Sequence, residues 1–242
     1  MITAKYALIT GASGGIGGAV ARKLASQGWN LYLHYSQQAK SVMKLMDELK
    51  QEFNIEVIPI QADFSNPDQA LELTQHIFSL HSIICCSGTA LYGLFQDIKQ
   101  QEIDDLWNIH MKSPMLLIQN LLPKLFRTKG NVVMISSVWG QTGAACEVVY
   151  SAVKGAQLSF VKALAKEVSR NGVRVNAVAP GIVDTNMMKD FTEAEVEELQ
   201  EEIPIGRFAL SREIADAVFY LTSEQSTYVT GHVLSVNGGW HI

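Results

Sequence analysis

Short apolar runs alternate with segments of helical periodicity along the chain, and this alternation limits the possible folds more than any other feature. The run AKYALIT precedes a helix expected over about residues 15–27, and NLYLHY precedes a helix that carries Val42, Leu45 and Leu49. Alternation of this kind predicts a parallel sheet covered by helices. Pro59 in the third run, IEVIPI, cannot donate to an interior ladder, so this strand belongs at a sheet edge. That position fits the strand order 3-2-1-4-5-6.

The later runs extend the same pattern. HSIICCSG, NVVMISS and RVNAVAPG predict the fourth, fifth and sixth strands, and HVLSVN closes the sheet. A long helical region is expected through Asn108 to Leu125, another helix begins at Tyr150, and a late helix is capped by Ser211. The sequence therefore predicts the α/β class, as a single-domain Rossmann fold with a doubly wound parallel sheet of about seven strands over residues 1–242.

Composition and charge limit the function. Apolar residues make up 48% of the 242 residues and charged residues 18%, which indicates a sizeable core. The formal net charge of -5 disfavours nucleic-acid binding, which needs clustered Lys and Arg. No apolar run approaches the ~18 residues that would cross a bilayer. The first strand begins almost directly after Met1 and leaves no room for a signal peptide, so we expect a cytoplasmic protein.

The cysteines indicate neither a metal site nor a disulfide framework. Cys85, Cys86 and Cys146 are odd in number and lack the CxxC or Cys/His spacing of a zinc site. We expect Cys85 and Cys86 to be core residues at a strand end. The sequence therefore predicts no bound metal.

A glycine-rich segment, TGASGGIG, follows the first predicted strand. Gly11, Gly15 and Gly17 stand where the chain must turn sharply and bring backbone amides close to a pyrophosphate at a helix N-terminus. Turns use glycine freely, but the strand before this cluster and the amphipathic helix after it supply the context of a dinucleotide site. The segment therefore predicts dinucleotide binding.

The end of the second strand bears on the choice of dinucleotide. Sites selective for NAD usually carry Asp or Glu there, and such a carboxylate repels a 2′-phosphate. The sequence has HYSQQ instead, which favours NADP(H). Ser36, with Lys40 as a second candidate, is left to meet the phosphate, because Gly14 occupies the loop position where a basic residue is often found.

Tyr150 and Lys154 lie four residues apart in YSAVK, so one helical face presents a phenol beside an ammonium. A cation one turn away is expected to lower the phenol pKa and make Tyr150 a useful proton donor. Ser137, at the end of the fifth strand, is placed to bind the same substrate oxygen. Taken alone, Tyr and Lys at this spacing are also typical of a solvated helix face.

Together, TGASGGIG, YSAVK and VNGGW resemble the classical short-chain dehydrogenase/reductase family, and the likeness covers the whole chain. The resemblance implies transfer of hydride from the nicotinamide to a substrate carbonyl, with a proton from Tyr150. Lys154 would hold the ribose, Ser137 would orient the carbonyl and Asn108 would hold a water relay. CCSG at residues 85–88 departs from the common NNAG, which puts the sheet-stabilising asparagine role in doubt.

The same resemblance implies which residues contact the cofactor. Asp63 is expected near the adenine ring, and Pro180, Gly181 and Thr185 beside the nicotinamide. The full expected set consists of Gly11, Ser13, Gly14, Gly15, Ile16, Gly17, Ser36, Asp63, Phe64, Ser87, Gly88, Tyr150, Lys154, Pro180, Gly181, Val183 and Thr185.

The overall pattern looks like the 3-oxoacyl-[acyl-carrier-protein] reductases of fatty acid biosynthesis, whose acidic partner usually meets basic residues near the active-site mouth. We hypothesise that Lys124, Arg127, Lys129 and Arg170 form this patch, although such residues also complement helix dipoles. A reading from another class is a regulator that binds dinucleotide without reacting. The presence of all four reactive residue types argues against the regulator.

The stretch SSVWGQTGAACEVVYSAVKGAQ resembles a narrower subgroup, the elongation factor P 5-aminopentanone reductases, whose substrate is an amine-bearing ketone on a protein lysine. We hypothesise that Glu147, just before the catalytic tyrosine, pairs with that ammonium; a loop acid facing solvent is the alternative. Trp139 and Met187 are the other candidate substrate contacts.

Residues 184–206 are expected to form the substrate lid. Seven acidic residues follow Asp184 before Ile203, and this acidity favours a basic or amine-bearing ligand over a polyanion. The helix after Tyr150 carries small residues such as Ala152 and Ala163, which permit close packing between subunits. The family resemblance implies a homotetramer, although small residues also suit packing inside one chain.

Overall fold

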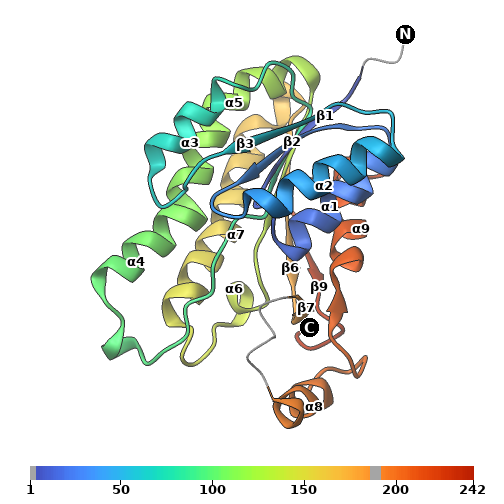
Figure 1. The fold of residues 1–242 in the computed structure, drawn as a ribbon. Coiled ribbons are helices and arrows are strands. Elements are labelled where there is room, and N and C mark those ends of the chain that lie inside the picture. The colour runs from blue at the N-terminus through green and yellow to red at the C-terminus, as the bar shows by residue number, and fades with distance from the viewer. Residues whose placement is uncertain (1–3, 186–191) are drawn as a thin grey trace.

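The computed structural model describes residues 4–185 and 192–242. Its centre is a parallel seven-stranded sheet of order β3-β2-β1-β4-β5-β6-β9, flanked by helices (Figure 1). This order confirms the predicted Rossmann topology, with Pro59 on the edge strand β3. The strands are β1 (Tyr6–Thr10), β2 (Asn30–Tyr35), β3 (Val57–Gln61), β4 (Ser82–Cys85), β5 (Asn131–Ile135), β6 (Arg174–Pro180) and β9 (Val233–Val236), with a separate parallel pair, β7 (Val183–Asp184) and β8 (Ala209–Leu210).

Helices cover both faces of the sheet because its strands are apolar on both sides. Side chains of α3, α5 and α7 form one core with the sheet, and those of α1, α2 and α9 form the other. The helices are α1 (Gly15–Ser26), α2 (Ala39–Glu52), α3 (Pro67–Thr74), α4 (Gln100–Trp107), α5 (Ser113–Thr128), α6 (Trp139–Thr142), α7 (Val148–Val168), α8 (Glu193–Glu201) and α9 (Ser211–Thr222).

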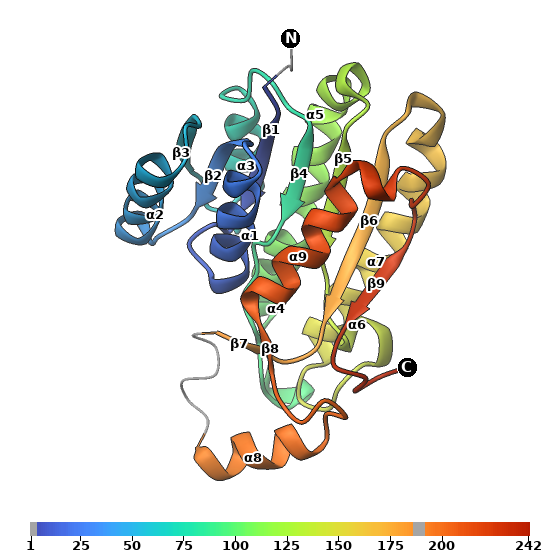
Figure 2. The same cartoon turned by 90° about the vertical axis from the view of Figure 1, so that its right-hand side faces the viewer.

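The parallel strands all end at the same edge of the sheet. Figure 2 shows the arrowheads of β4, β6 and β9 pointing toward the end of the molecule where α6 and α8 lie. In doubly wound sheets, ligands bind at this carboxyl edge. The segments after β1, β4, β5 and β6 carry most of the residues expected at the active site, so the topology brings them together.

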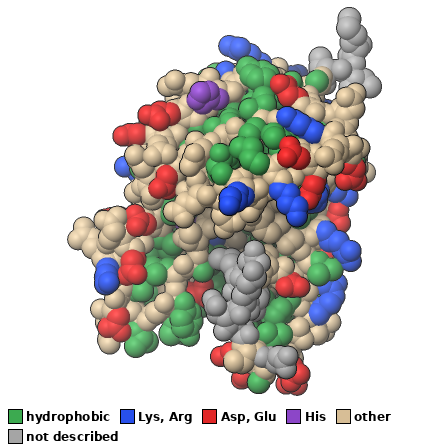
Figure 3. Space-filling view, viewed as in Figure 1, with side chains coloured by type: hydrophobic (Ala, Val, Ile, Leu, Met, Phe, Trp, Pro, Cys, Tyr) green, Lys and Arg blue, Asp and Glu red, His purple; other side chains and the backbone are tan. Residues whose placement is uncertain are grey.

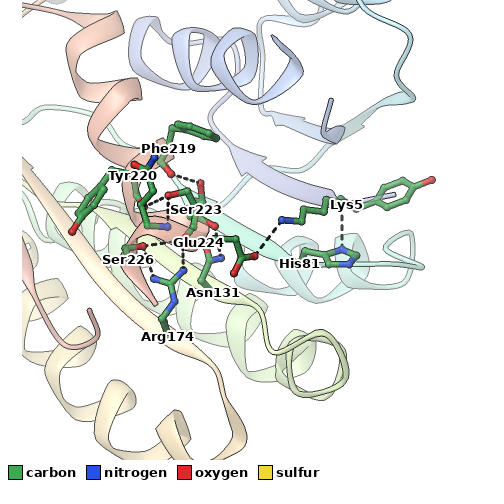
Figure 4. Close-up of polar contacts among 12 residues, drawn as sticks. Lys5, His81, Asn131, Arg174, Phe219, Tyr220, Ser223, Glu224 and Ser226 are labelled. Carbon is green, nitrogen blue, oxygen red and sulfur yellow. Dashed lines mark hydrogen bonds and ion pairs between the residues drawn. The ribbon is translucent and has the colours of Figure 1, made fainter. Parts of the chain in front are cut away.

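The opposite end of the sheet, where the parallel strands begin, is held by a polar network around Arg174 (Figure 4). The Arg174 guanidinium donates to the backbone oxygen of Leu221 at 2.7 Å and to Ser226 Oγ at 3.0 Å. Glu224, from the same turn, pairs with Lys5 at 3.4 Å. These contacts join the end of α9 to the start of β6, so they support the sheet far from the carboxyl edge.

Several helix boundaries differ from the expectations, and α7 begins at Val148 rather than at Tyr150. The long region through Asn108 is interrupted by a π-helical turn, Asn108–Lys112, between α4 and α5. Ser211 is the first residue of α9 rather than its cap, because the Glu213 carboxylate accepts from the Leu210 backbone N–H at 2.8 Å and closes the helix end itself. Within the described residues, no helix is long and apolar enough to span a bilayer.

Candidate active site

The glycine-rich turn between β1 and α1 has the shape of a phosphate cradle. Gly14 N–H donates to the Gly11 oxygen at 3.0 Å, and a Cβ on Gly17 would lie 2.3 Å from that same oxygen. The N-cap of α1 is Gly14, which has no side chain to cap the first backbone N–H groups of the helix. Gly14 and Gly15 are exposed. Together these features fit a dinucleotide pyrophosphate.

His34, inside β2, holds this turn in place, and no sequence motif indicated this role. Its Nδ1 accepts from Gly11 N–H at 3.1 Å, so the neutral ring carries its proton on Nε2, which donates to the Ala62 oxygen at 2.9 Å. Phe64 stacks on the ring at 4.1 Å between centroids. Burial lowers the His34 pKa to about 4, so the ring stays neutral and keeps both bonds.

Residues 85–88, with the sequence CCSG, replace the NNAG that is common in the family, and other groups connect β1 to β4 here. Thr10 Oγ1 accepts from the backbone N–H groups of Cys86 and Ser87, both at 3.1 Å, and thereby ties the end of β4 to β1. A Cβ on Gly88 would lie 2.6 Å from the ring of His110. Threonine and backbone groups therefore make the connection between strands here, and Gly88 allows close packing.

The expected adenine-side residues lie at the ends of β2 and β3. Ser36 is partly buried and Lys40 is exposed at the start of α2. The Asp63 carboxylate accepts from Ser65 N–H at 3.0 Å. The Phe64 side chain is buried against His34, so only the backbone of Phe64 could face a cofactor.

The segment after β6 returns to the glycine turn. Pro180 ends β6, and Gly181 N–H donates to the Val236 oxygen at 3.1 Å. Past Val183, the side chain of Thr185 reaches Gly15, where an added Cβ would lie 2.9 Å from Thr185 Cγ2. The structure thus brings both expected cofactor segments together. Met187 lies outside the described residues.

Tyr150, in the first turn of α7, lies beside the Ser137 hydroxyl, which favours the phenolate and lowers the Tyr150 pKa. The expected lowering of its pKa is wrong for this state of the protein. Burial raises the pKa of Tyr150 to about 12, and the negative charge of Glu147 adds to the rise. The Lys154 ammonium lies over the ring, 5.4 Å from its centroid, and desolvation of the phenol dominates.

Lys154 is almost fully buried beneath Tyr150. Its Nζ donates to the Ile135 oxygen at 2.9 Å, and its own backbone oxygen accepts from Ser136 Oγ at 2.9 Å. A Cβ on Gly140 would lie 2.7 Å from the Lys154 carbonyl carbon, so α6 and α7 pack closely here. Burial lowers the pKa of Lys154 to about 8. The ammonium is therefore positioned by the end of β5.

This buried ammonium predicts a pH-dependent stability. Between the folded pKa of about 8 and the ordinary value of 10.5, the unfolded chain binds a proton that the folded chain does not. The free energy of unfolding of the cofactor-free protein should therefore gain a rising contribution across this range, and Lys154→Met should lack it. Urea denaturation of both proteins at pH 8, 9 and 10 measures the difference. Parallel pH dependences would contradict the lowered pKa.

Asn108 begins the π-helical turn, a feature frequent at functional sites. Its Nδ2 donates to the Ser65 oxygen at 3.0 Å, so the amide is directed toward the loop between β3 and α3. Two residues later, the buried ring of His110 packs edge-on against Tyr150 at 5.7 Å between centroids. Burial lowers the His110 pKa to about 3, so a neutral ring lies beside the phenol. In the sequence, only the proximity of His110 to Asn108 indicated that His110 belongs to the site.

Glu147 lies close enough to the phenol for its charge to raise the Tyr150 pKa. Glu147 is half-buried, and burial raises the pKa of its carboxyl, whereas the neighbouring Trp139 side chain lowers it. Trp139 in turn packs edge-on against Trp240 at 4.8 Å between centroids. Trp240 was not among the expected site residues, although it ends the VNGGW motif.

The hypothetical docking patch does not lie at the mouth of this chain's own site. Lys124, Arg127 and Lys129 lie toward the end of α5, which leads into the start of β5, and Arg170 lies beyond the end of α7. At 1.5 Å per residue, α7 carries the chain roughly 30 Å from Tyr150 to Arg170. Within one chain the patch is at the opposite edge of the sheet, so this expectation is wrong. The expectation did not take into account that the whole length of α7 separates Arg170 from Tyr150.

No group of three or more His, Cys, Asp or Glu side chains within residues 4–185 and 192–242 could hold a metal ion. The three cysteines in this part of the chain are free thiols, and Cys85 is buried as expected.

The nucleotide cradle and the paired Tyr150 and Ser137 define a Rossmann-type oxidoreductase site. A family model described as enoyl-(acyl carrier protein) reductase matches residues 11–241. The chain is 51% identical over 239 residues to the Bacillus subtilis uncharacterized oxidoreductase YmfI, covering 98% of this chain and 99% of the relative. It is 33% identical to the Rickettsia bellii 3-oxoacyl-[acyl-carrier-protein] reductase FabG, covering 98% and 97%. The chain therefore belongs to the short-chain dehydrogenase/reductase family and is 3-oxoacyl-[acyl-carrier-protein] reductase-like within it.

A solved structure supports the same assignment. The blue fluorescent protein from a metagenomic library, determined in complex with NADPH, matches with a TM-score of 0.93 and 27% identity, covering 98% of each chain.

Proposed function

We propose that this protein reduces a ketone to a secondary alcohol with NADP(H) as its cofactor. The observation that carries the proposal is that Tyr150 lies beside the buried Ser137 hydroxyl at the carboxyl edge of the sheet, where the turn after the first strand has the shape of a phosphate cradle. NADPH, when bound, supplies the hydride. Tyr150 donates the proton to the carbonyl oxygen, and Ser137 holds that oxygen in place.

The remaining catalytic roles follow from position. Lys154 holds its charge beside the phenol through its bond to the Ile135 oxygen, and we assign it contact with the cofactor ribose. Asn108, at the π-helical turn, is assigned to the water relay that returns a proton to Tyr150. A protein without turnover on any carbonyl would instead support the alternative of a dinucleotide-binding regulator.

NADPH should be preferred over NADH, because the end of β2 carries no acid to bond the ribose hydroxyls or to repel a 2′-phosphate. The NADPH-bound structural relative supports this choice. The ratio of kcat/KM for the two cofactors measures the preference. Ser36→Asp should reverse it, whereas Ser41→Asp, on the exposed side of α2, is the matched control. A wild-type advantage for NADH would contradict the assignment.

The first candidate substrate is a 3-oxoacyl thioester on acyl carrier protein, in fatty acid biosynthesis. The 33% identical FabG relative supports it, because that protein is named for this reaction. An acidic carrier would need to dock away from α8, whose glutamates line one end of the molecule (Figure 3). The basic residues on α5 lie at the opposite edge of the same chain.

The second candidate is the 5-aminopentanone modification on elongation factor P. Within the described residues, the Glu147 carboxylate has no ion-pair partner, and Glu195, Glu197 and Glu198 are exposed on α8, in the expected lid. Both features favour an amine-bearing substrate over an anionic one. A side-by-side assay of acetoacetyl thioester and aminopentanone-modified elongation factor P, with NADPH, decides between the candidates. The substrate that is turned over faster is the supported candidate, and the other candidate is then rejected.

We propose that residues 184–206 form the substrate lid. We also propose that the protein assembles as a homotetramer. Ala152, Ser159 and Ala163 are exposed on α7, which supports close packing against a second subunit. Light scattering coupled to size-exclusion chromatography tests the assembly, and a monomer would contradict it.

A further inference from the structure

The His34 ring makes polar contacts with three segments that are expected to line the cofactor. Its Nδ1 accepts from Gly11 N–H in the glycine-rich turn at 3.1 Å, and the Ser87 hydroxyl after β4 lies 3.4 Å from the same nitrogen. From the other side of the ring, Nε2 donates to the Ala62 oxygen after β3 at 2.9 Å. Since β1 lies between β2 and β4 in the sheet, the ring reaches past the end of β1 and joins the loops after three different strands.

These contacts require one form of the imidazole. Gly11 N–H needs an unprotonated Nδ1, and the Ala62 oxygen needs a proton on Nε2, so the neutral ring with its proton on Nε2 satisfies both. The ring is 2% exposed and stacks on Phe64. The negative charge of Asp63 raises the His34 pKa, but burial dominates and lowers it to about 4. The ring therefore keeps this tautomer at neutral pH.

The turn that His34 holds has little freedom at Gly11. This residue has a φ of +66°, and an added Cβ would lie 2.8 Å from Ser87 Cα, so two cofactor loops come into contact here. Ala12 N–H donates to the His34 backbone oxygen at 2.9 Å, so β2 holds the turn by one backbone bond and one side-chain bond. Without the imidazole, the partly buried Gly11 N–H would lose its acceptor, and the turn would rearrange to find another.

We propose that His34 is a positioning residue that joins the two ends of the dinucleotide site. Through Gly11 it holds the turn that fits the pyrophosphate, and through Ala62 it holds the loop expected at the adenine. The proposal rests on the dinucleotide binding of the proposed function. A turn that adopts its binding conformation for only a fraction of the time binds the cofactor more weakly by that fraction. His34 therefore sets cofactor affinity without contact with the substrate.

Two amide substitutions separate the two bonds of the ring. An asparagine oxygen lies close to the position of Nδ1, so His34→Asn keeps an acceptor for Gly11 N–H and loses the bond to the Ala62 oxygen. A glutamine NH2 group lies close to the position of Nε2, so His34→Gln keeps the bond to Ala62 and loses the acceptor for Gly11. The two ligands to be titrated are NADPH, which needs both ends of the site, and adenosine 2′-phosphate, which needs the adenine end alone.

Isothermal titration calorimetry of the full chain measures both affinities. His34→Gln should raise the dissociation constant of NADPH roughly tenfold and leave that of adenosine 2′-phosphate within about twofold of wild type. His34→Asn should raise both dissociation constants by similar factors, because the adenine loop loses its bond. An NADPH affinity equal to that of wild type in both variants would overturn the proposal. Equal losses for both ligands in both variants would also overturn it, since they would show a general disturbance of the sheet.

His81 supplies the matched control, because its Nδ1 accepts from a backbone N–H, that of Tyr6, at 3.1 Å at the other end of β1 (Figure 4). His81→Gln should lower the melting temperature and leave the dissociation constant of NADPH unchanged. A purely structural role for His34 would give this same result in His34→Gln, and would contradict the proposal.

Steady-state kinetics separate this proposal from the proposed function. In ketone reduction, His34→Gln should raise the KM for NADPH and affect kcat at saturating NADPH little, because Tyr150 and Ser137 are untouched. Absence of turnover in wild type, with the dissociation constants behaving as expected, would refute ketone reduction alone. An unchanged KM for NADPH in an active His34→Gln protein would refute the role of His34 alone.

Nitrogen NMR of the wild-type protein gives a readout that needs no variant. In protein labelled with ¹⁵N-histidine, the assigned His34 ring should carry its proton on Nε2 and none on Nδ1 between about pH 6 and 8, with and without NADPH. A proton on Nδ1 in this range would remove the acceptor for Gly11 N–H and overturn the proposal.

Discussion

Tyr150→Phe should lower kcat for ketone reduction by roughly a hundred- to ten-thousandfold, because it removes the proton donor while keeping the ring that packs against His110. NADPH affinity should change little, since the cradle between β1 and α1 is untouched. Steady-state NADPH oxidation measures the loss, and a fluorescence titration measures the dissociation constant of NADPH.

The matched control for this prediction is Tyr228→Phe, which makes the same change at a fully exposed tyrosine and should leave kcat unaltered. If Tyr150→Phe retained near-wild-type kcat, another group would be the acid. His110 is the neighbouring alternative, but its low pKa and buried position make it a poor donor at neutral pH.

Gly17→Ala should abolish NADPH binding and lower the melting temperature. The added Cβ would lie 2.3 Å from the Gly11 oxygen and 2.9 Å from the Gly11 carbonyl carbon, which are backbone atoms of the same turn. Relieving this clash must open the turn, at a cost typical of overpacking, about 1–3 kcal/mol. Differential scanning fluorimetry with and without NADPH reads both effects, because the variant should also lose the stabilisation that NADPH gives.

The adjacent glycine provides a close control. A Cβ on Gly18 would meet its nearest atom, the Ala12 oxygen, at 3.5 Å, an ordinary contact. Gly18→Ala should therefore keep NADPH binding and, through the helix propensity of alanine, should stabilise α1 by up to about 1 kcal/mol. Equal behaviour of the two variants would show that the turn does not need its close backbone approach.

The fold was predictable because its signals are local and repeat along the chain. Each strand is a short apolar run, and the Pro59 ring alone was enough to place β3 at the edge of the sheet. The glycine turn was equally predictable, since its spacing, its strand and its helix are contiguous in sequence.

The contacts that shape the site were not predictable, because they join distant segments. The bond from Gly11 to His34 and the packing of His110 on Tyr150 depend on where whole elements meet. The pKa of Tyr150 was expected to fall because the spacing to Lys154 was visible, whereas the burial that raises it was not. The basic residues after α5 and α7 looked suited to docking until the helix lengths put them at the far edge of the sheet.

The central claim is that this chain transfers hydride from NADPH to a ketone while Tyr150 gives the proton. The most direct measurement is a reaction of wild-type protein with NADPH deuterated at C4 on either face, followed by mass analysis of the alcohol. Deuterium should appear on the carbinol carbon from one face only, and almost none should appear with Tyr150→Phe over the same time. Saturated NADPH binding without deuterium in the product of any ketone tested would contradict it.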